Sequence, residues 1–119
     1  MTEPEIKIPG VNVEAGLDIV GGEIDIYIAV LQSYVDNTPS VLDNLRNVSQ
    51  ENLQDYIIAV HGLKSISVGI GADALSERAR KLETKAKAGD LSGVLTENEE
   101  LLKNAETLVN DIRNWLKEL

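Results

Sequence analysis

The 119-residue chain has a formal net charge of −9, one histidine and no cysteine, and its length fits a single domain with its own hydrophobic core. The lack of cysteine excludes disulfides and thiolate metal sites and favours a reducing compartment, and the negative charge argues against nucleic acid or an anionic membrane as a partner. Because no signal peptide and no run of about 20 continuous apolar residues is visible, we expect a cytoplasmic protein without membrane insertion. We also expect it to be a monomer.

Helical periodicity begins after a short opening segment. Residues 1–11 contain two prolines and a glycine and predict a leader or linker, so the folded domain is expected over residues 12–119. Asn12 can cap a short helix that ends at the glycine pair 21–22. A longer helix is expected to open at Glu23.

This second helix carries an apolar stripe with two tyrosines alongside. The dipeptide Thr38-Pro39 is typical of a helix N-terminus, with a capping threonine and proline at the first helical position, so the helix is expected to restart or kink there. The stripe before the proline comprises Ile24, Ile28, Leu31 and Val35, with Tyr27 and Tyr34 beside it.

The rest of the chain is organised around residues 53–70, which predict the central helix. At about 100° per residue, one side of this helix is a core stripe, and His61 points roughly 140° away from it, toward solvent. Lys64 and Ser65 follow one turn later, so the three side chains form a polar cluster from which the lysine ammonium reaches outward. The core stripe comprises Tyr56, Val60, Leu63, Ser67 and Ile70.

Two further helices complete the expected fold. Residues 72–88 place leucine and alanine inside and basic residues outside, and Gly89 ends this helix. Asp90 caps the last and longest helix, in which Asn98 is the one polar break of the apolar pattern. Because no strand pattern or hairpin dipeptide occurs, we expect an all-α fold, an antiparallel up-down four-helix bundle with a short extra N-terminal helix.

Charge is distributed unevenly along the chain. Residues 1–60 hold ten acidic and two basic residues, a balance of −8, whereas residues 61–90 hold four acidic and six basic residues, a balance of +2. The second segment is either an ordinary solvated helix face or a mild positive patch beside the histidine that meets an acidic partner. A lone histidine without cysteine argues against a transition-metal site, and no glycine-rich phosphate loop follows a strand.

The histidine cluster suits the transfer of a phosphoryl group. A neutral imidazole is a competent nucleophile, and Lys64 lies at the helical spacing that lets it neutralise an anion on the ring of His61. A hydrolase triad of serine, histidine and aspartate is conceivable from composition, since Ser65 lies one turn from His61, but the serine sits in mid-helix without an evident oxyanion site. Since the chain has no nucleotide site, the phosphoryl group must come from another protein.

These residues resemble the histidine-containing phosphotransfer (Hpt) domain family, whose signature is His-x-Leu-Lys-Gly followed by Gly-Ala and Leu-Glu pairs. The opening at residues 8–17 is similar to Hpt domains at the C-terminus of hybrid sensor histidine kinases, and the resemblance covers residues 8–117. The matching residues are Val60-His61-Gly62-Leu63-Lys64-Ser65, Gly71-Ala72, Leu75 and Leu82-Glu83, together with Gly21-Gly22 and Tyr27 in the opening.

The resemblance implies a role for each residue of the site. His61 is expected to be the phosphoacceptor through its outward ring nitrogen, and Lys64 to steady the phosphoryl oxygens. Ser65 stands where the family usually has glycine, and its hydroxyl can donate a hydrogen bond to the substrate. Glu83 falls where some relatives carry a polar residue that orients the site.

Such domains relay phosphoryl groups between receiver-domain aspartates and have no kinase activity of their own. The expected partners are therefore receiver domains of response regulators or a hybrid histidine kinase. No cofactor is expected on this chain, and Mg²⁺ is expected on the receiver, which supplies most of the catalysis.

An apolar surface around His61 gives a second expectation. Four residues of the central helix project away from the core stripe, and a cluster of exposed apolar residues beside a reactive group suggests a docking surface; the alternative is that one or more of them pack against neighbouring helices. The alternative function is a helical docking or scaffold module that is not phosphorylated, with the histidine incidental. The expected docking residues are Ile57, Ile58, Gly62 and Val68.

Overall fold

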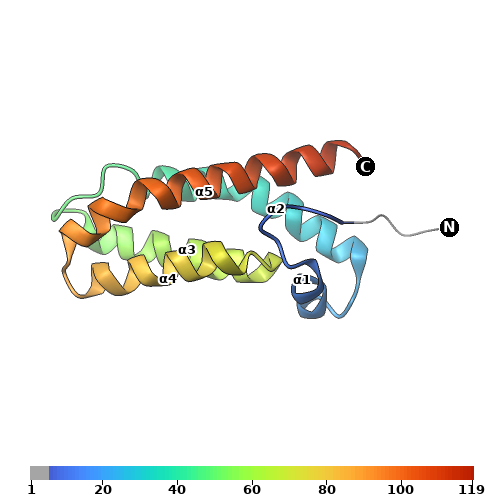
Figure 1. The fold of residues 1–119 in the computed structure, drawn as a ribbon, viewed down its shortest axis with the longest axis horizontal. Coiled ribbons are helices and arrows are strands. Elements are labelled where there is room, and N and C mark those ends of the chain that lie inside the picture. The colour runs from blue at the N-terminus through green and yellow to red at the C-terminus, as the bar shows by residue number, and fades with distance from the viewer. Residues whose placement is uncertain (1–5) are drawn as a thin grey trace.

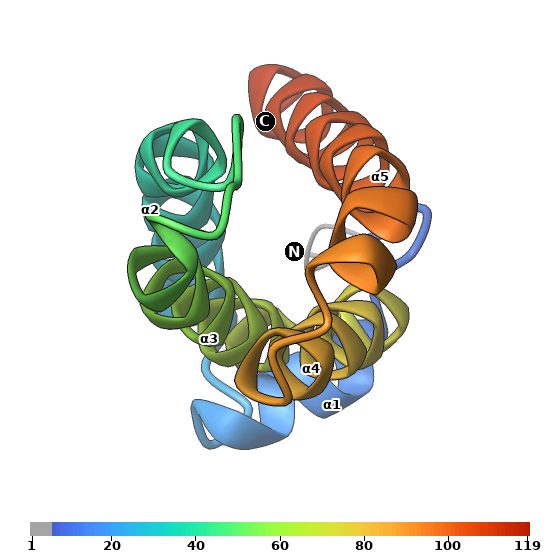
Figure 2. The same ribbon diagram turned by 90° about the vertical axis from the view of Figure 1, so that its left-hand side faces the viewer.

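The computed structural model describes residues 6–119, which contain five helices and no strand. Consecutive long helices run in opposite directions, and viewed along the bundle they enclose a common core (Figures 1 and 2). This arrangement confirms the expected all-α bundle with a short N-terminal helix. The helices are α1 (Val13–Ile19), α2 (Ile24–Asp43), α3 (Leu53–Ile70), α4 (Asp73–Lys87) and α5 (Leu91–Lys117).

The core stripe of α3 lies where the sequence pattern puts it. All five of its residues are buried, and α3 packs against α1, α2 and α4. The expected inward residues of α4 are buried as well, so α3 and α4 lie side by side with their apolar stripes in the core (Figure 1). These inward residues of α4 are Leu75, Ala79, Leu82 and Ala86.

The predicted apolar stripe of α2 is confirmed at Leu31 and Val35, which are buried, but not at its start. Tyr27 and Tyr34 are buried, whereas Ile24 and Ile28 are only half-buried. The tyrosines can enter the core because their hydroxyls find partners on the last two turns of α3: Tyr27 Oη donates to the carbonyl of Ile70 at 2.8 Å, and Tyr34 Oη shares a 3.0 Å hydrogen bond with the Ser67 hydroxyl.

Of the two alternatives expected at Pro39, a restart or a kink of the helix, the restart is wrong. Helix α2 runs through this proline without a break, and the proline itself is exposed. Val35 before it and Leu42 after it are both buried, so core packing on either side holds one helix despite the lost backbone hydrogen bond. A kink within the continuous helix stays a prediction.

The segment before α1 packs against the end of α3. Ile8 is buried in the core, and the backbone N–H of Asn12 donates to the carbonyl of Gly71 at 2.8 Å. The side chain of Asn12 caps α1, as expected, by accepting from the N–H of Ala15. The division into a leader at 1–11 and a domain at 12–119 stays a prediction, and residues 1–5 lie outside the described residues.

Gly71 ends α3 in the left-handed conformation, with φ +83°, and allows the backbone at Asn12 to pack closely against it. A Cβ atom at this position would lie 2.1 Å from the carbonyl oxygen of Asn12, so only glycine fits. No helix in the described part of the chain is both long and apolar enough to cross a membrane.

Candidate functional site

Helix α3 turns His61 toward α4 and leaves it accessible to solvent. Because Val60 and Leu63 are anchored in the core, the histidine one residue on from Val60 must face outward. Its side chain is 56% exposed, which confirms the orientation expected from the sequence.

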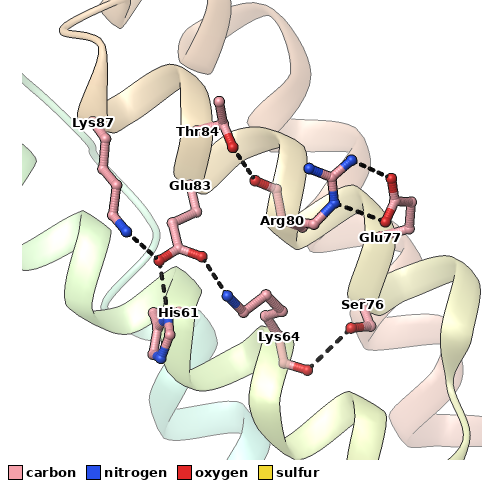
Figure 3. Close-up of polar contacts among 8 residues, drawn as sticks. All are labelled: His61, Lys64, Ser76, Glu77, Arg80, Glu83, Thr84 and Lys87. Carbon is pink, nitrogen blue, oxygen red and sulfur yellow. Dashed lines mark hydrogen bonds and ion pairs between the residues drawn. The ribbon is translucent and has the colours of Figure 1, made fainter.

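Helix α4 supplies the partner of this histidine. The carboxylate of Glu83 is buried, and its Oε2 lies 2.8 Å from His61 Nδ1 (Figure 3). Its Oε1 accepts a hydrogen bond from Lys64 Nζ at 2.8 Å, and Lys87 Nζ lies 3.1 Å from Oε2. One buried carboxylate therefore joins the histidine to two lysines, one from each helix.

This carboxylate is ionised at any ordinary pH. The hydrogen bond from Lys64, followed by those from Lys87 and His61, lowers the pKa of Glu83 from its ordinary value of 4.5 to about 2, although burial acts in the opposite direction. An ionised carboxylate can only accept hydrogen bonds. The Nδ1 atom of His61 must therefore be the donor in the contact with Glu83.

The tautomer of the histidine follows from that contact. In a neutral imidazole one ring nitrogen carries the proton and the other has a free lone pair. With the proton on Nδ1, the lone pair of His61 lies on Nε2. In Figure 3 this nitrogen points away from Glu83, and it makes no hydrogen bond within residues 6–119. The geometry thus presents a nucleophilic atom to an incoming partner.

Lys64 lies in a different place from the one expected. The sequence suggested that its ammonium reaches outward, but the side chain is only 26% exposed and its Nζ lies on Glu83. The reason is electrostatic, because a buried carboxylate without a cation would be costly. A second contact joins the two helices at Lys64: the hydroxyl of Ser76 on α4 donates a hydrogen bond to the backbone carbonyl of Lys64 at 3.2 Å.

The small residues next to the histidine leave room above it. Ser65 is exposed one turn beyond His61, and a Cβ atom added to Gly62 would meet no atom within 4 Å. A reacting group can therefore approach the ring from outside the bundle.

The four expected docking residues are not equally accessible. Ile58 is 71% exposed and Val68 47% exposed, which is unusual for large apolar side chains on a helix. Gly62 is half-buried. Ile57 is also half-buried and packs against the core, so little of its surface can meet a partner.

One member of the cluster was missed by the sequence reasoning. Lys87 is one of the six basic residues of the 61–90 segment, and its spacing of four residues from Glu83 on one helix predicts the ion pair that forms. Glu83 itself was identified through the family resemblance alone. Residues 6–119 contain no group of three histidine or acidic side chains placed to hold a metal ion.

Comparisons with known proteins identify the family of the chain. The Hpt domain family model matches residues 29–117. The phosphorelay protein LuxU of Vibrio harveyi is 32% identical over 109 residues, which cover 92% of this chain and 90% of LuxU. The LuxU proteins of Vibrio vulnificus strains YJ016 and CMCP6 are each 33% identical over 85 residues, which cover 71% of this chain and 68% of theirs. No solved structure gives a significant match.

The similarity extends over most of the chain and includes the α3–α4 pair that carries the histidine cluster. The narrower likeness of the opening segment to domains fused to hybrid kinases stays a prediction. The chain belongs to the Hpt domain family, the histidine phosphotransfer proteins of two-component signalling, which are not kinases themselves.

Proposed function

We propose that His61 is the phosphoacceptor of this Hpt domain and that it exchanges its phosphoryl group with the aspartate of a receiver domain in a response regulator or hybrid kinase. The observation that carries the proposal is the 2.8 Å contact between His61 Nδ1 and Glu83 Oε2. It leaves the lone pair on Nε2, on the exposed side of the ring. No other histidine is present in the chain.

The transfer step needs no proton movement on this chain. The Nε2 lone pair attacks the phosphorus of the receiver's aspartyl phosphate, and the N–P bond forms as the P–O bond breaks. The aspartate leaves with the bonding electrons as a carboxylate. Since the proton stays on Nδ1, the phosphorylated ring carries a positive charge, which the carboxylate of Glu83 stabilises at hydrogen-bond distance. The same steps in reverse return the phosphoryl group.

Lys64 and Ser65 complete the proposed site on this chain. The ammonium of Lys64 provides positive charge one helical turn from His61, and the exposed hydroxyl of Ser65 can donate a hydrogen bond to a phosphoryl oxygen. We expect Mg²⁺ to act from the acidic pocket of the receiver and not from this chain.

The receiver is proposed to dock on the exposed face of α3, with Ile58 and Val68 as its main apolar contacts, Gly62 as the point of close approach and Ile57 as a marginal contact. We further propose that the protein acts as a monomer in the cytoplasm. The chain's lack of cysteine is typical of a reducing compartment.

The test is phosphate uptake from a panel of receiver domains that have first been phosphorylated with acetyl phosphate. We expect acid-labile, base-stable phosphate on this chain, mapped to the peptide that contains His61. In addition, ¹⁵N NMR of the neutral ring should show the proton on Nδ1. A chain that binds a receiver but takes up no phosphate would instead be a docking module, and phosphate on another residue would overturn the assignment.

A further inference from the structure

Two lysines share the buried carboxylate of Glu83, and they hold different oxygens. Lys64, from α3, donates to Oε1 at 2.8 Å, whereas Lys87, the last residue of α4, lies 3.1 Å from Oε2. Oε2 is also the oxygen that accepts from His61 Nδ1. Figure 3 shows the two ammonium groups approaching the carboxylate from opposite sides. A single cation would suffice to balance one carboxylate.

The second cation matters because Lys64 has two uses in the proposed function. Before transfer its ammonium is bound to Glu83, whose side chain is only 6% exposed. During transfer the same ammonium is needed at the phosphoryl oxygens, on the other side of the ring. Withdrawing the only cation from a buried carboxylate is costly, since an unpaired buried charge is strongly destabilised.

We propose that Lys87 is a positioning residue that keeps Glu83 paired while Lys64 moves to the phosphoryl group. This inference rests on the proposed function of His61. With Lys87 in place, Glu83 retains one ammonium and its hydrogen bond to the ring when Lys64 leaves. Glu83 therefore continues to hold the proton on Nδ1 and to orient Nε2 throughout the transfer.

The position of Lys87 fits this indirect role. Its side chain is 61% exposed, so it binds Glu83 from the solvent side without displacing Lys64. A simpler explanation is that Lys87 only balances the negative end of the α4 helix dipole, as basic residues in a last turn commonly do. Lys85 lies in the same last turn and forms its own ion pair, with Glu97 at 3.1 Å. It provides a matched control for that explanation.

The experiment measures phosphoryl transfer from a phosphorylated receiver domain to Lys87→Ala, Lys87→Arg and Lys85→Ala, each in the full chain. We expect Lys87→Ala to lower the maximal rate at saturating receiver by about 3- to 10-fold with little change in the half-saturating concentration. Lys87→Arg should recover most of the rate. Lys85→Ala should change the rate by less than about 2-fold.

The decisive arm repeats Lys87→Ala in a Glu83→Gln background. Because the neutral glutamine needs no cation, removing Lys87 there should slow transfer by less than about 2-fold further. An equal loss in both backgrounds would overturn the proposal and place Lys87 on the phosphoryl group or the receiver. A loss as large in Lys85→Ala would assign the effect to helix-end charge, and an unchanged rate in Lys87→Ala would remove the role altogether.

Failure here is distinguishable from failure of the proposed function. The phosphorylated peptide is mapped in every variant, so phosphate found on His61 upholds the acceptor whatever the rates show. Melting temperatures of the lysine variants, expected to agree within a few degrees, exclude unfolding as a cause.

Discussion

Two polar clusters of this bundle differ in their surroundings. One lies in the core and joins α3, α5 and the turn that follows α2, and the other lies between α3 and α4 and reaches the surface. In the first, Tyr56 Oη donates to Asn98 Oδ1 at 2.8 Å, and Asn98 Nδ2 donates to the Leu45 carbonyl at 2.8 Å. All three residues are buried and neutral. In the second, a buried carboxylate holds two lysines and the half-exposed His61.

The difference lies in what each cluster leaves unpaired. The Tyr56–Asn98 cluster satisfies its polar groups inside the core, so it contributes to stability and fixes the register of α5 against α3. The Glu83 cluster fixes one nitrogen of His61 and leaves the other facing solvent. Damage to the first cluster should therefore appear in unfolding, and damage to the second in phosphoryl transfer.

The largest effect is expected for His61→Gln, which should abolish phosphate uptake. Glutamine has no nucleophilic ring nitrogen, while Glu83 keeps both lysines, so the free energy of unfolding should change by about 1 kcal/mol or less. Phosphate uptake and thermal melts measured on the same sample check both parts. Phosphate on the glutamine variant would show that another residue is the acceptor.

Lys64→Ala should slow transfer by about 10- to 1,000-fold, the range for loss of one electrostatic contact to developing charge. Lys64→Arg should keep part of the rate. Arginine supplies the positive charge, but its planar guanidinium spreads that charge, whereas the lysine ammonium concentrates it at one point. Single-turnover transfer from a phosphorylated receiver measures both. Equal rates for the alanine variant and the wild type would exclude Lys64 from the site.

Asn98→Ala tests the other cluster and should lower the free energy of unfolding by about 2–4 kcal/mol. It leaves the Tyr56 hydroxyl and the Leu45 carbonyl without their partner and opens a cavity. Tyr56→Phe, which removes only the hydroxyl, should cost less. Urea unfolding measures both changes. At a temperature where the variants are folded, their rates of phosphoryl transfer should match that of the wild type. A loss of transfer in folded Asn98→Ala would show that this cluster also contributes to transfer.

Val68→Glu tests the surface beside the reactive cluster. Because Val68 is exposed, the fold should survive, whereas affinity for a receiver should fall by roughly 1–3 kcal/mol through lost apolar contact and repulsion from the receiver's acidic pocket. Titration with a receiver domain and thermal melts decide the point. A large drop in melting temperature would mean that the side chain packs in the core and would remove it from the docking surface.

The sequence could predict the helices and the orientation of His61 because both follow from the 3.6-residue period. Once the apolar residues of α3 occupy the core, the direction of every other side chain on that helix is set. It could not show that Tyr27 and Tyr34 lie deeper than Ile24 and Ile28, since that depends on hydrogen-bond partners 43 and 33 residues further along the chain. The unbroken helix at Pro39 likewise depends on tertiary packing, which the dipeptide Thr38-Pro39 alone cannot predict.

The site was predicted in part for the same reason. His61, Lys64 and Ser65 share one helix, so their proximity is a matter of spacing. The contact of Glu83 with His61 and Lys64 joins two helices and depends on how α3 and α4 are aligned, which periodicity within either helix leaves open. For that reason the ammonium of Lys64 was expected in solvent and lies on a carboxylate instead.

The smallest expected effect is on the free energy of unfolding in acid, where the two clusters should differ most clearly. Glu83 has its pKa lowered to about 2 in the folded chain, against 4.5 ordinarily, so its ion pairs stabilise the fold above about pH 4.5. That contribution should be lost as the pH falls from about 4.5 to 2, and we expect it to be only about 1–2 kcal/mol because His61 and Lys87 are solvent-exposed. The difference in free energy of unfolding between wild type and Glu83→Gln should therefore shrink over that interval.

The Tyr56–Asn98 cluster provides the control. Burial raises the pKa of Tyr56, so this cluster stays neutral, and the difference in free energy of unfolding between wild type and Tyr56→Phe should be constant over the same pH range. Urea unfolding at pH 2 to 6 measures both differences, and a pH-independent difference for Glu83→Gln would contradict the ion-pair assignment.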